Sequence, residues 1–228
     1  MEIKEYQYRE NYFKDYYPKE LNKFTLKDIQ KIRNWFWGWF KYLNKFVDIK
    51  NGNNRKVLEI GCAIGGFSSL LKEHNFDVYA SDVSSYIISY ARKFWPGIKF
   101  FEFDIQEGIP INEQFDIIFS FEVLEHLKDP EKALENMYKK LSPNGTLICS
   151  TPPPYKRFIN IKGHINVKSA QEWRNILEKV GFQKDRVKIE QVAFMPFLYR
   201  YSKKLSLVIP IRINLPYFNE SIFLIARR

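Results

Sequence analysis

The stretch VLEIGCAIGG, residues 57–66, decides the fold. Its apolar residues up to Ile60 predict a short buried strand, and glycines at positions 61, 65 and 66 follow before a helical pattern begins. Because glycine has no Cβ, the backbone can turn tightly there and approach a ligand closely. Ligands of open α/β sheets bind at the carboxyl ends of strands, where this turn lies. Many strand–helix turns carry glycine for geometry alone. Whether this turn belongs to a binding site must therefore be judged from the neighbouring elements.

Strands and helices alternate after this turn. The apolar patterns predict strands at 56–60, 77–81, 98–103, 115–121, 146–150, 187–194 and 221–226. Helices are predicted at 67–74, 84–94, 129–141 and 169–181, and a turn at 142–145. Such alternation predicts a mostly parallel sheet with helices on both faces, which is an α/β fold.

An aromatic arm precedes this unit. Thr25 followed by Asp28 is typical of a helix start. Apolar residues then recur at helical spacing, namely Ile29, Ile32, Phe36, Phe40, Leu43 and Val47. The polar stretch 51–54 ends this part. We therefore expect a helical arm or cover at residues 1–50 and a domain at residues 51–228, with a long insertion at about 195–219.

Composition narrows the choice of partners. The formal net charge is +10, which favours acidic partners such as anionic lipid, but no block of five or more like charges occurs, and we do not expect nucleic acid. The two cysteines, Cys62 and Cys149, form neither a disulfide framework nor a metal-site spacing. The polar start and the lack of a membrane-length apolar run predict a cytoplasmic protein.

Acidic residues end two neighbouring predicted strands. Asp82 closes the second strand, 21 residues after Gly61, and Asp104 closes the third. A carboxylate in the first position can accept hydrogen bonds from both hydroxyls of a ribose. Asp82 could instead cap the following helix, although Ser84 could do so equally well. Together the two carboxylates indicate a nucleoside-like ligand across this edge of the sheet.

Six segments in order resemble the motifs of class I S-adenosylmethionine-dependent methyltransferases, and in particular the ubiquinone-biosynthesis-like group of small-molecule methyltransferases. They are VLEIGCAIGG, SDVS, FEFD, FDIIFSFEVLEHLKDP, LSPNGTLICSTPPP and HINVKSAQEWRNILEKVGF. The resemblance covers about residues 55–194 and the last strand. It implies a Rossmann-like, seven-stranded, mostly parallel sheet whose last strand is antiparallel, and a chain that uses S-adenosylmethionine as methyl donor.

The resemblance also implies roles for individual residues. The methionine part of the donor would be surrounded by Glu59, Gly61, Cys62, Ala63 and Gly65, and bordered by Phe121 near the methyl group. Asp82 would bind the ribose and Val83 the adenine, whose amino group and face would meet Asp104 and Ile105. Ala63 departs from the family, which usually has glycine there, and we expect this change to be tolerated.

An acceptor hydroxyl must lose a proton, which requires a base or a metal. His126 and His164 fall in loops at the expected site edge, and Glu122, Glu125 and His126 share one face if they are helical. With His164 they resemble the divalent-metal site of some methyltransferases that act on RNA ends or catechols. The residues support a metal held by Glu122, Glu125, His126 and His164, and equally catalysis by His126, His164 and Glu122 without metal.

Two other classes of function compete with methyl transfer from S-adenosylmethionine to a small-molecule, lipid-linked or sugar-linked hydroxyl. A nicotinamide-dependent oxidoreductase would use the same turn and Asp82, but its fingerprint requires glycine at position 63. A non-catalytic membrane-surface protein could keep the fold, yet the intact Gly61, Asp82 and Asp104 argue against a lost cofactor site. The aromatic and basic insertion predicts a cover over a lipophilic acceptor that also contacts anionic membrane.

Overall fold

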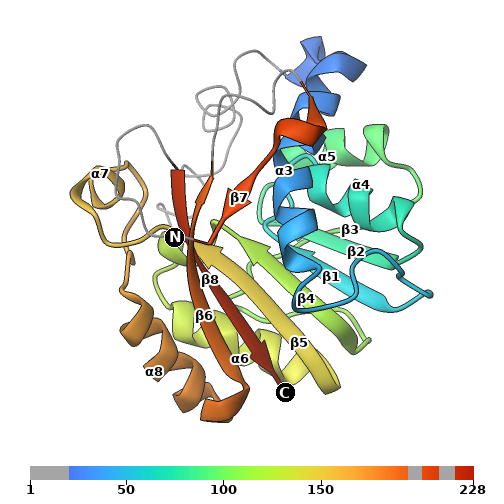
Figure 1. Cartoon of the computed structure of the whole chain (residues 1–228). Coiled ribbons are helices and arrows are strands. Elements are labelled where there is room, and N and C mark those ends of the chain that lie inside the picture. Colours follow the sequence, from blue (N-terminus) through green and yellow to red (C-terminus); the bar gives the residue numbers. More distant parts are fainter. Residues whose placement is uncertain (1–20, 195–201, 211–218) are drawn as a thin grey trace.

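The computed structural model describes residues 21–194, 202–210 and 219–228, and a twisted sheet forms its centre (Figure 1). Its eight strands lie in the order β3-β2-β1-β4-β5-β8-β6-β7. They are β1 (Lys56–Ile60), β2 (Asp77–Asp82), β3 (Lys99–Glu102), β4 (Phe115–Phe121), β5 (Leu141–Thr151), β6 (Val187–Phe194), β7 (Val208–Ile209) and β8 (Asn219–Arg227).

Helices cover both faces of the sheet (Figure 1). One face carries α3 (Leu26–Leu43), α4 (Gly66–Glu73) and α5 (Ser85–Phe94), and the other carries α6 (Pro130–Lys140) and α8 (Ala170–Val180). The short α7 (Lys156–Ile159) lies at the rim. The described residues also contain four 3₁₀ turns, η1 (Leu21–Lys23), η2 (Leu124–His126), η3 (Lys184–Arg186) and η5 (Lys203–Leu205). Within the described residues no helix is both long and apolar enough to cross a bilayer.

The pairing of the strands confirms the predicted α/β fold. Strands β3, β2, β1, β4 and β5 pair in parallel, and β8 pairs antiparallel with both β5 and β6. The antiparallel last strand is therefore where it was expected. The prediction of seven strands was one short, because Val208 and Ile209 pair with Phe194 and Ala193 at the open edge of β6. An edge strand offers unpaired backbone groups that such a short segment can satisfy.

The predicted turn at 142–145 is wrong, since these residues belong to β5. Leu141 pairs with Phe115, but the next pair is Thr146 with Ile117, so β5 holds extra residues that bulge out of the ladder. Asn144 accommodates the bulge with a positive φ of 64°. The turn-forming residues thus produce an irregularity within a strand rather than its start.

Helix starts follow the predicted caps. The Asp28 carboxylate accepts the backbone N–H of Thr25 at 2.9 Å, and the Asp129 carboxylate accepts that of Lys132 at 2.9 Å. At α8 the Glu172 carboxylate accepts the Ser169 N–H at 2.8 Å, completing a capping box. The predicted stripe of the first helix extends too far, because α3 ends at Leu43 and Val47 lies beyond it.

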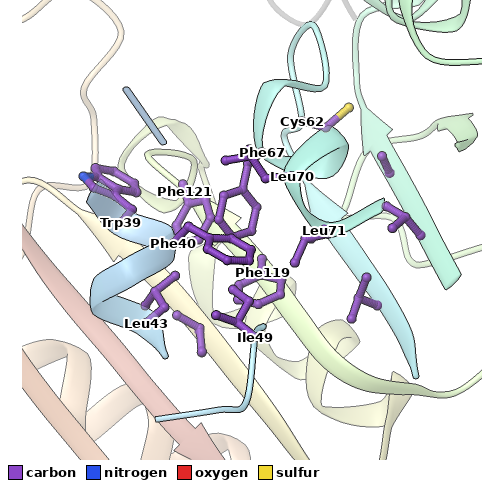
Figure 2. Close-up of a cluster of buried hydrophobic side chains, with 14 of the residues drawn as sticks. Trp39, Phe40, Leu43, Ile49, Cys62, Phe67, Leu70, Leu71, Phe119 and Phe121 are labelled. Atoms are coloured by element: carbon purple, nitrogen blue, oxygen red, sulfur yellow. The ribbon is translucent and has the colours of Figure 1, made fainter. Parts of the chain in front are cut away.

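The arm shares one core with the domain. Trp39, Phe40 and Leu43 of α3 pack in the same buried cluster as Phe67 of α4 and Phe121 of β4 (Figure 2). This contact places α3 beside the carboxyl ends of the central strands. Residues 1–20 and most of the predicted insertion at 195–219 lie outside the described residues, so the predicted bounds of arm and domain stay a prediction.

Candidate active site

The turn between β1 and α4 adopts left-handed backbone at three positions. Gly61, Ala63 and Gly65 have φ angles of 73°, 47° and 79°. At Gly61 a Cβ would also lie 2.3 Å from Cγ2 of Val123, so no other residue fits without displacement of that side chain. Ala63 adopts a left-handed conformation that costs an L-residue about 1 kcal/mol. Alanine in place of the usual glycine therefore introduces backbone strain at this position. The N–H groups of Gly61 and Cys62 donate to the Ser81 carbonyl at 2.8 and 2.9 Å, so the tight turn is fixed against the end of β2.

Asp82 is joined to this turn by hydrogen bonds. Its Oδ2 accepts the backbone N–H of Ala63 at 3.0 Å, and its Oδ1 accepts that of Ser84 at 3.0 Å. Burial raises the pKa of the Asp82 carboxyl to about 6. Each carboxylate oxygen has a second lone pair that can accept a further bond. The side chain thus organises the turn and the start of α5 and still keeps capacity for a ligand.

The end of β3 lies beside Asp82, since Asp82 pairs with Glu102 in the parallel register. Asp104 follows two residues later, half-buried, and accepts the N–H of Gln106 at 2.9 Å. Val83 is 40% exposed at this edge, whereas Ile105 is buried. Val83 directly follows Asp82 and offers an exposed apolar side chain to a planar ring. The residues expected to meet a nucleoside are therefore brought together.

Other residues assigned to the donor face the interior. The Glu59 carboxyl is buried and accepts the hydroxyl of Ser68 in α4. Cys62 lies at one end of the buried cluster, and the ring of Phe121 lies within it (Figure 2). These side chains tie the turn to α4 and β4. Their contact with the methionine part of a donor stays a prediction.

Glu59 makes stability depend on pH. Burial raises its pKa from the ordinary 4.5 to about 8. Between these values the folded state keeps a proton that the unfolded state releases, so the free energy of unfolding falls as pH rises. We expect Glu59 to contribute about 2 kcal/mol of this fall between pH 6 and pH 8. Urea unfolding of the wild type and Glu59→Gln should show the smaller fall in the variant, and equal falls would contradict the assignment.

Glu122 follows β4 with left-handed backbone, at φ 54°. Its Oε1 accepts the hydroxyls of Ser150 at 2.7 Å and Ser221 at 3.0 Å. The expectation that Glu122, Glu125 and His126 share one helical face is wrong, because only Leu124–His126 form a 3₁₀ turn and Glu122 precedes it. The strained backbone and the two serines direct this carboxylate toward the ends of β5 and β8.

Glu125, His126 and His164 come together beyond β4. One ligand atom from each can be chosen so that all three lie within 4.8 Å of one another. The loop is held in place because the backbone N–H groups of Ile165 and Asn166 donate to the Glu125 carbonyl at 2.8 and 2.9 Å. This set contains three of the four predicted metal ligands and omits Glu122.

The two imidazoles are oriented alike. Nδ1 of His126 lies 3.0 Å from the Gly163 carbonyl, and Nδ1 of His164 lies 2.9 Å from that of Phe158. Each contact places the proton of the neutral ring on Nδ1 and its lone pair on Nε2, the arrangement typical of metal-bound histidine. Burial lowers the pKa of His126 to about 4 and that of His164 in the same direction, so both are neutral at pH 7.

Glu125 carries a buried carboxyl group. Among the described residues, neither of its oxygens has a hydrogen bond of normal geometry, although the Thr151 hydroxyl and the Glu122 carboxyl lie close enough to shift its pKa. Burial, and then the charge of Glu122, raise the pKa of Glu125 well above its usual range. A buried polar group without a partner is costly, and a cation bound beside it would remove that cost. The donor set therefore fits a divalent ion.

The sequence did not indicate every residue of this site. Ser150, Thr151 and Ser221 contribute hydroxyls, yet nothing in the local pattern distinguishes them from other strand serines and threonines. They reach the site because β5 and β8 pair antiparallel, with Ser150 opposite Phe223 and Thr151 opposite Ile222. Only the strand order could have revealed them.

Comparison with known proteins places this geometry in a family. A family model described as a methyltransferase domain matches residues 33–187, more than half of the chain. Phosphoethanolamine N-methyltransferase 3 of Arabidopsis thaliana is 29% identical over 168 residues, which cover 68% of this chain and 34% of that protein. Ubiquinone biosynthesis O-methyltransferase of Coxiella burnetii is 30% identical over 115 residues, covering 49% and 48%.

A solved structure shares the fold. The S-adenosylmethionine-dependent methyltransferase of Archaeoglobus fulgidus superimposes with a TM-score of 0.63 at 18% identity, covering 96% of this chain and 99% of that one. The chain spans about a third to a half of the length of the curated relatives it matches. From the family match and the site geometry, this chain belongs to the class I S-adenosylmethionine-dependent methyltransferases.

Proposed function

We propose that this protein transfers a methyl group from S-adenosylmethionine to a hydroxyl of a small-molecule or lipophilic acceptor. The observation that carries the proposal is the bond between Asp82 and the glycine turn, beside the exposed Val83. A buried carboxylate beside a tight glycine turn and an exposed apolar side chain together suit a nucleoside with an attached amino acid. The bound donor supplies a methyl group already activated on a sulfonium.

The protein's part is mainly to position the donor. In this proposal Asp82 accepts bonds from the ribose hydroxyls, and Asp104 accepts one from the adenine amino group. The turn at 61–65 carries the methionine part, and Phe121 borders the methyl group at the end of β4. Because β1 and β4 pair in parallel, the turn and Phe121 lie at the same edge of the sheet.

Replacement of Asp82 by alanine should weaken binding of S-adenosylhomocysteine by more than about tenfold, since a charge-assisted bond to a hydroxyl is lost. Asp82→Asn keeps an acceptor for the Ala63 N–H and should give an intermediate loss. Asp77→Ala at the start of β2, where Asp77 pairs with the exposed Lys99, is the matched control and should bind normally. Calorimetry that finds unchanged affinity in a folded Asp82→Ala protein would refute the ribose assignment.

Acceptor activation is best explained by a divalent ion held by Glu125, His126 and His164. Such an ion lowers the pKa of a bound hydroxyl. The metal-free alternative uses His126 or His164 as general base, but His126, with a pKa of about 4, is a weak base at neutral pH, and burial also lowers the pKa of His164. Glu122, outside the set and fixed by Ser150 and Ser221, would then accept the hydroxyl proton.

The acceptor itself can be sought directly. The similar proteins are named for methylation of nitrogen in phosphoethanolamine and of oxygen in ubiquinone biosynthesis. An ion that lowers a hydroxyl pKa favours oxygen, because a neutral amine is nucleophilic without such activation. Purified protein with isotopically labelled donor should label an oxygen in a panel of phenols, phosphoethanolamine and lipid extract. Labelling confined to nitrogen would oppose the proposal.

Two segments favour a lipophilic acceptor at a membrane surface. Residues 152–169 and 191–219 each contain four lysines or arginines and no aspartate or glutamate. In their described parts, five large apolar side chains are exposed, namely Ile159, Ile161, Ile165, Leu205 and Leu207. Apolar side chains among cations are typical of surfaces that contact anionic lipid. We propose that these two segments make peripheral contact with anionic membrane.

Co-sedimentation tests this contact. The protein should pellet with vesicles that contain anionic phosphatidylserine at low salt, and much less at high salt, because screening weakens the attraction. Neutral phosphatidylcholine vesicles are the lipid control. The variant Ile161→Ser should pellet less, whereas Ile98→Val in the interior should pellet normally. No binding to anionic vesicles at low salt would remove the membrane proposal.

A further inference from the structure

A serine near the C-terminus, Ser206, is hydrogen-bonded to the backbone in the middle of α3. Ser206 follows η5, and its side chain is fully buried. Its hydroxyl accepts the backbone N–H of Gly38 at 2.9 Å and donates to the carbonyl of Trp35 at 3.0 Å. One side chain therefore contacts two backbone groups of one helical turn, 171 and 168 residues away in sequence.

This contact explains a glycine in the centre of a helix. A Cβ at Gly38 would lie 2.5 Å from Oγ of Ser206 and 3.0 Å from its backbone. Glycine in a helix interior is destabilising relative to alanine, because more backbone freedom is lost on folding. The absence of a side chain at position 38 is thus what lets the later segment reach the helix backbone.

The same helix also contacts the first residue of α4, which directly follows the donor turn. At Gly66, where α4 begins after the glycine turn, a Cβ would lie 2.6 Å from Cγ2 of Ile32 and 3.4 Å from Cδ2 of Phe36. Phe36 also packs against Phe67 and Phe121, with ring centroids 5.7 and 6.3 Å apart. The position of α3 therefore determines what covers the start of α4.

The segment of Ser206 is anchored at its other end by the sheet. Val208 and Ile209 form β7 on the edge of β6, while η5, the red helical turn in Figure 1, lies against α3. Lys203 adds a contact by placing its Nζ 4.8 Å from the centre of the Trp37 ring. Residues 202–209 thus join the β6 edge of the sheet to the helix that packs on the start of α4, next to the donor turn.

We propose that Ser206 is a positioning residue for the donor site, acting through Gly38 and α3, and this inference rests on the proposed function. Without its hydroxyl, α3 loses its fixed connection to the sheet edge and samples positions in which Ile32 and Phe36 no longer hold the start of α4 beside the donor turn. A protein whose binding-competent state is only partly populated binds its ligand more weakly by that fraction. Ser206 thereby links the C-terminal half of the chain to donor affinity.

The test uses S-adenosylhomocysteine as probe and calorimetry as readout. Ser206→Ala should bind the probe about tenfold more weakly than the wild type, since two buried hydrogen bonds are lost. Ser202→Ala is the matched control, because the Ser202 hydroxyl accepts the N–H of Lys204 and has no bond to α3. It should bind normally. A merely structural role for Ser206 would lower the melting temperature and leave the affinity of the folded protein unchanged.

A double-mutant cycle shows whether Gly38 and Ser206 act together. Gly38→Ala alone should also weaken probe binding, because its methyl group displaces Ser206. In the Gly38→Ala background the further change Ser206→Ala should have little additional effect, as expected for two groups of one contact. Losses that simply multiply would overturn the proposal, and so would full affinity in Ser206→Ala. Failure of the wild type itself to bind the probe would instead refute the proposed function.

Discussion

Replacement of Phe67 by alanine is expected to destabilise the protein by about 3–5 kcal/mol, the range for deletion of a large aromatic side chain from a core. Phe67 is fully buried. Its ring lies among four others, with centroids 4.8 Å from Phe121, 5.0 Å from Phe119, 5.7 Å from Phe36 and 6.3 Å from Phe40. Figure 2 shows Phe67 beside Phe40, Phe119 and Phe121.

The size of this effect follows from the position of Phe67 between layers. Two of its partners come from α3 and two from β4, so one truncation opens a cavity between the arm and the sheet. Equilibrium unfolding in denaturant measures the loss. Ile159→Ala, at an exposed position of α7, is the control and should change stability by less than about 0.5 kcal/mol. A loss below about 1.5 kcal/mol for Phe67→Ala would mean that α3 does not complete this core.

Removal of the proposed divalent ion is expected to lower methyl transfer by about 100-fold or more, the effect of losing the group that activates the acceptor. Donor binding should persist, because no donor-site residue belongs to the set Glu125, His126 and His164. Two imidazoles in a ligand set favour transition metals over magnesium. Activity lost on chelation should therefore return with Mn²⁺ or Co²⁺.

Two variants distinguish activation of the acceptor by the ion from general-base catalysis by a histidine. Glu125→Gln should lose both metal binding and turnover, although it leaves both imidazoles intact. His74→Gln changes the remaining histidine, which packs on Phe40 and Trp37 rather than in the site, and should keep its turnover per folded molecule. Full activity in metal-free buffer, or a Glu125→Gln variant that is active without metal, would contradict the metal proposal.

Local patterns predicted the central fold well because they report burial and backbone geometry directly. The apolar run 115–121 became β4, and the glycines at 61 and 65 adopt the positive φ angles that only such residues reach easily. Asp82 ends β2 and Asp104 follows the end of the neighbouring β3, because parallel strands align their carboxyl ends. A structural feature that depends on a single strand, helix or turn can therefore be predicted from the sequence of that element alone.

What the sequence did not reveal depends on long-range pairing. The 3₁₀ turn at Leu124–His126 removed Glu122 from the shared face that its spacing suggested, since the chain had to redirect at the end of β4. Similarly, Ser221 reaches Glu122, and Ser206 reaches Gly38, only through the fold. Residues 142–145 carry turn chemistry, yet their neighbours continue the ladder into β5, so pairing outweighed local preference.

The central claim, that this edge of the sheet binds a methyl donor, is tested most directly by calorimetric titration of the wild-type protein with S-adenosylhomocysteine and, separately, with NAD⁺. The oxidoreductase alternative requires a dinucleotide, whereas Ala63 stands where its fingerprint has glycine. We predict saturable binding of S-adenosylhomocysteine at one site per chain and no measurable binding of NAD⁺. No binding of S-adenosylhomocysteine by the folded protein, or tighter binding of NAD⁺, would contradict the claim.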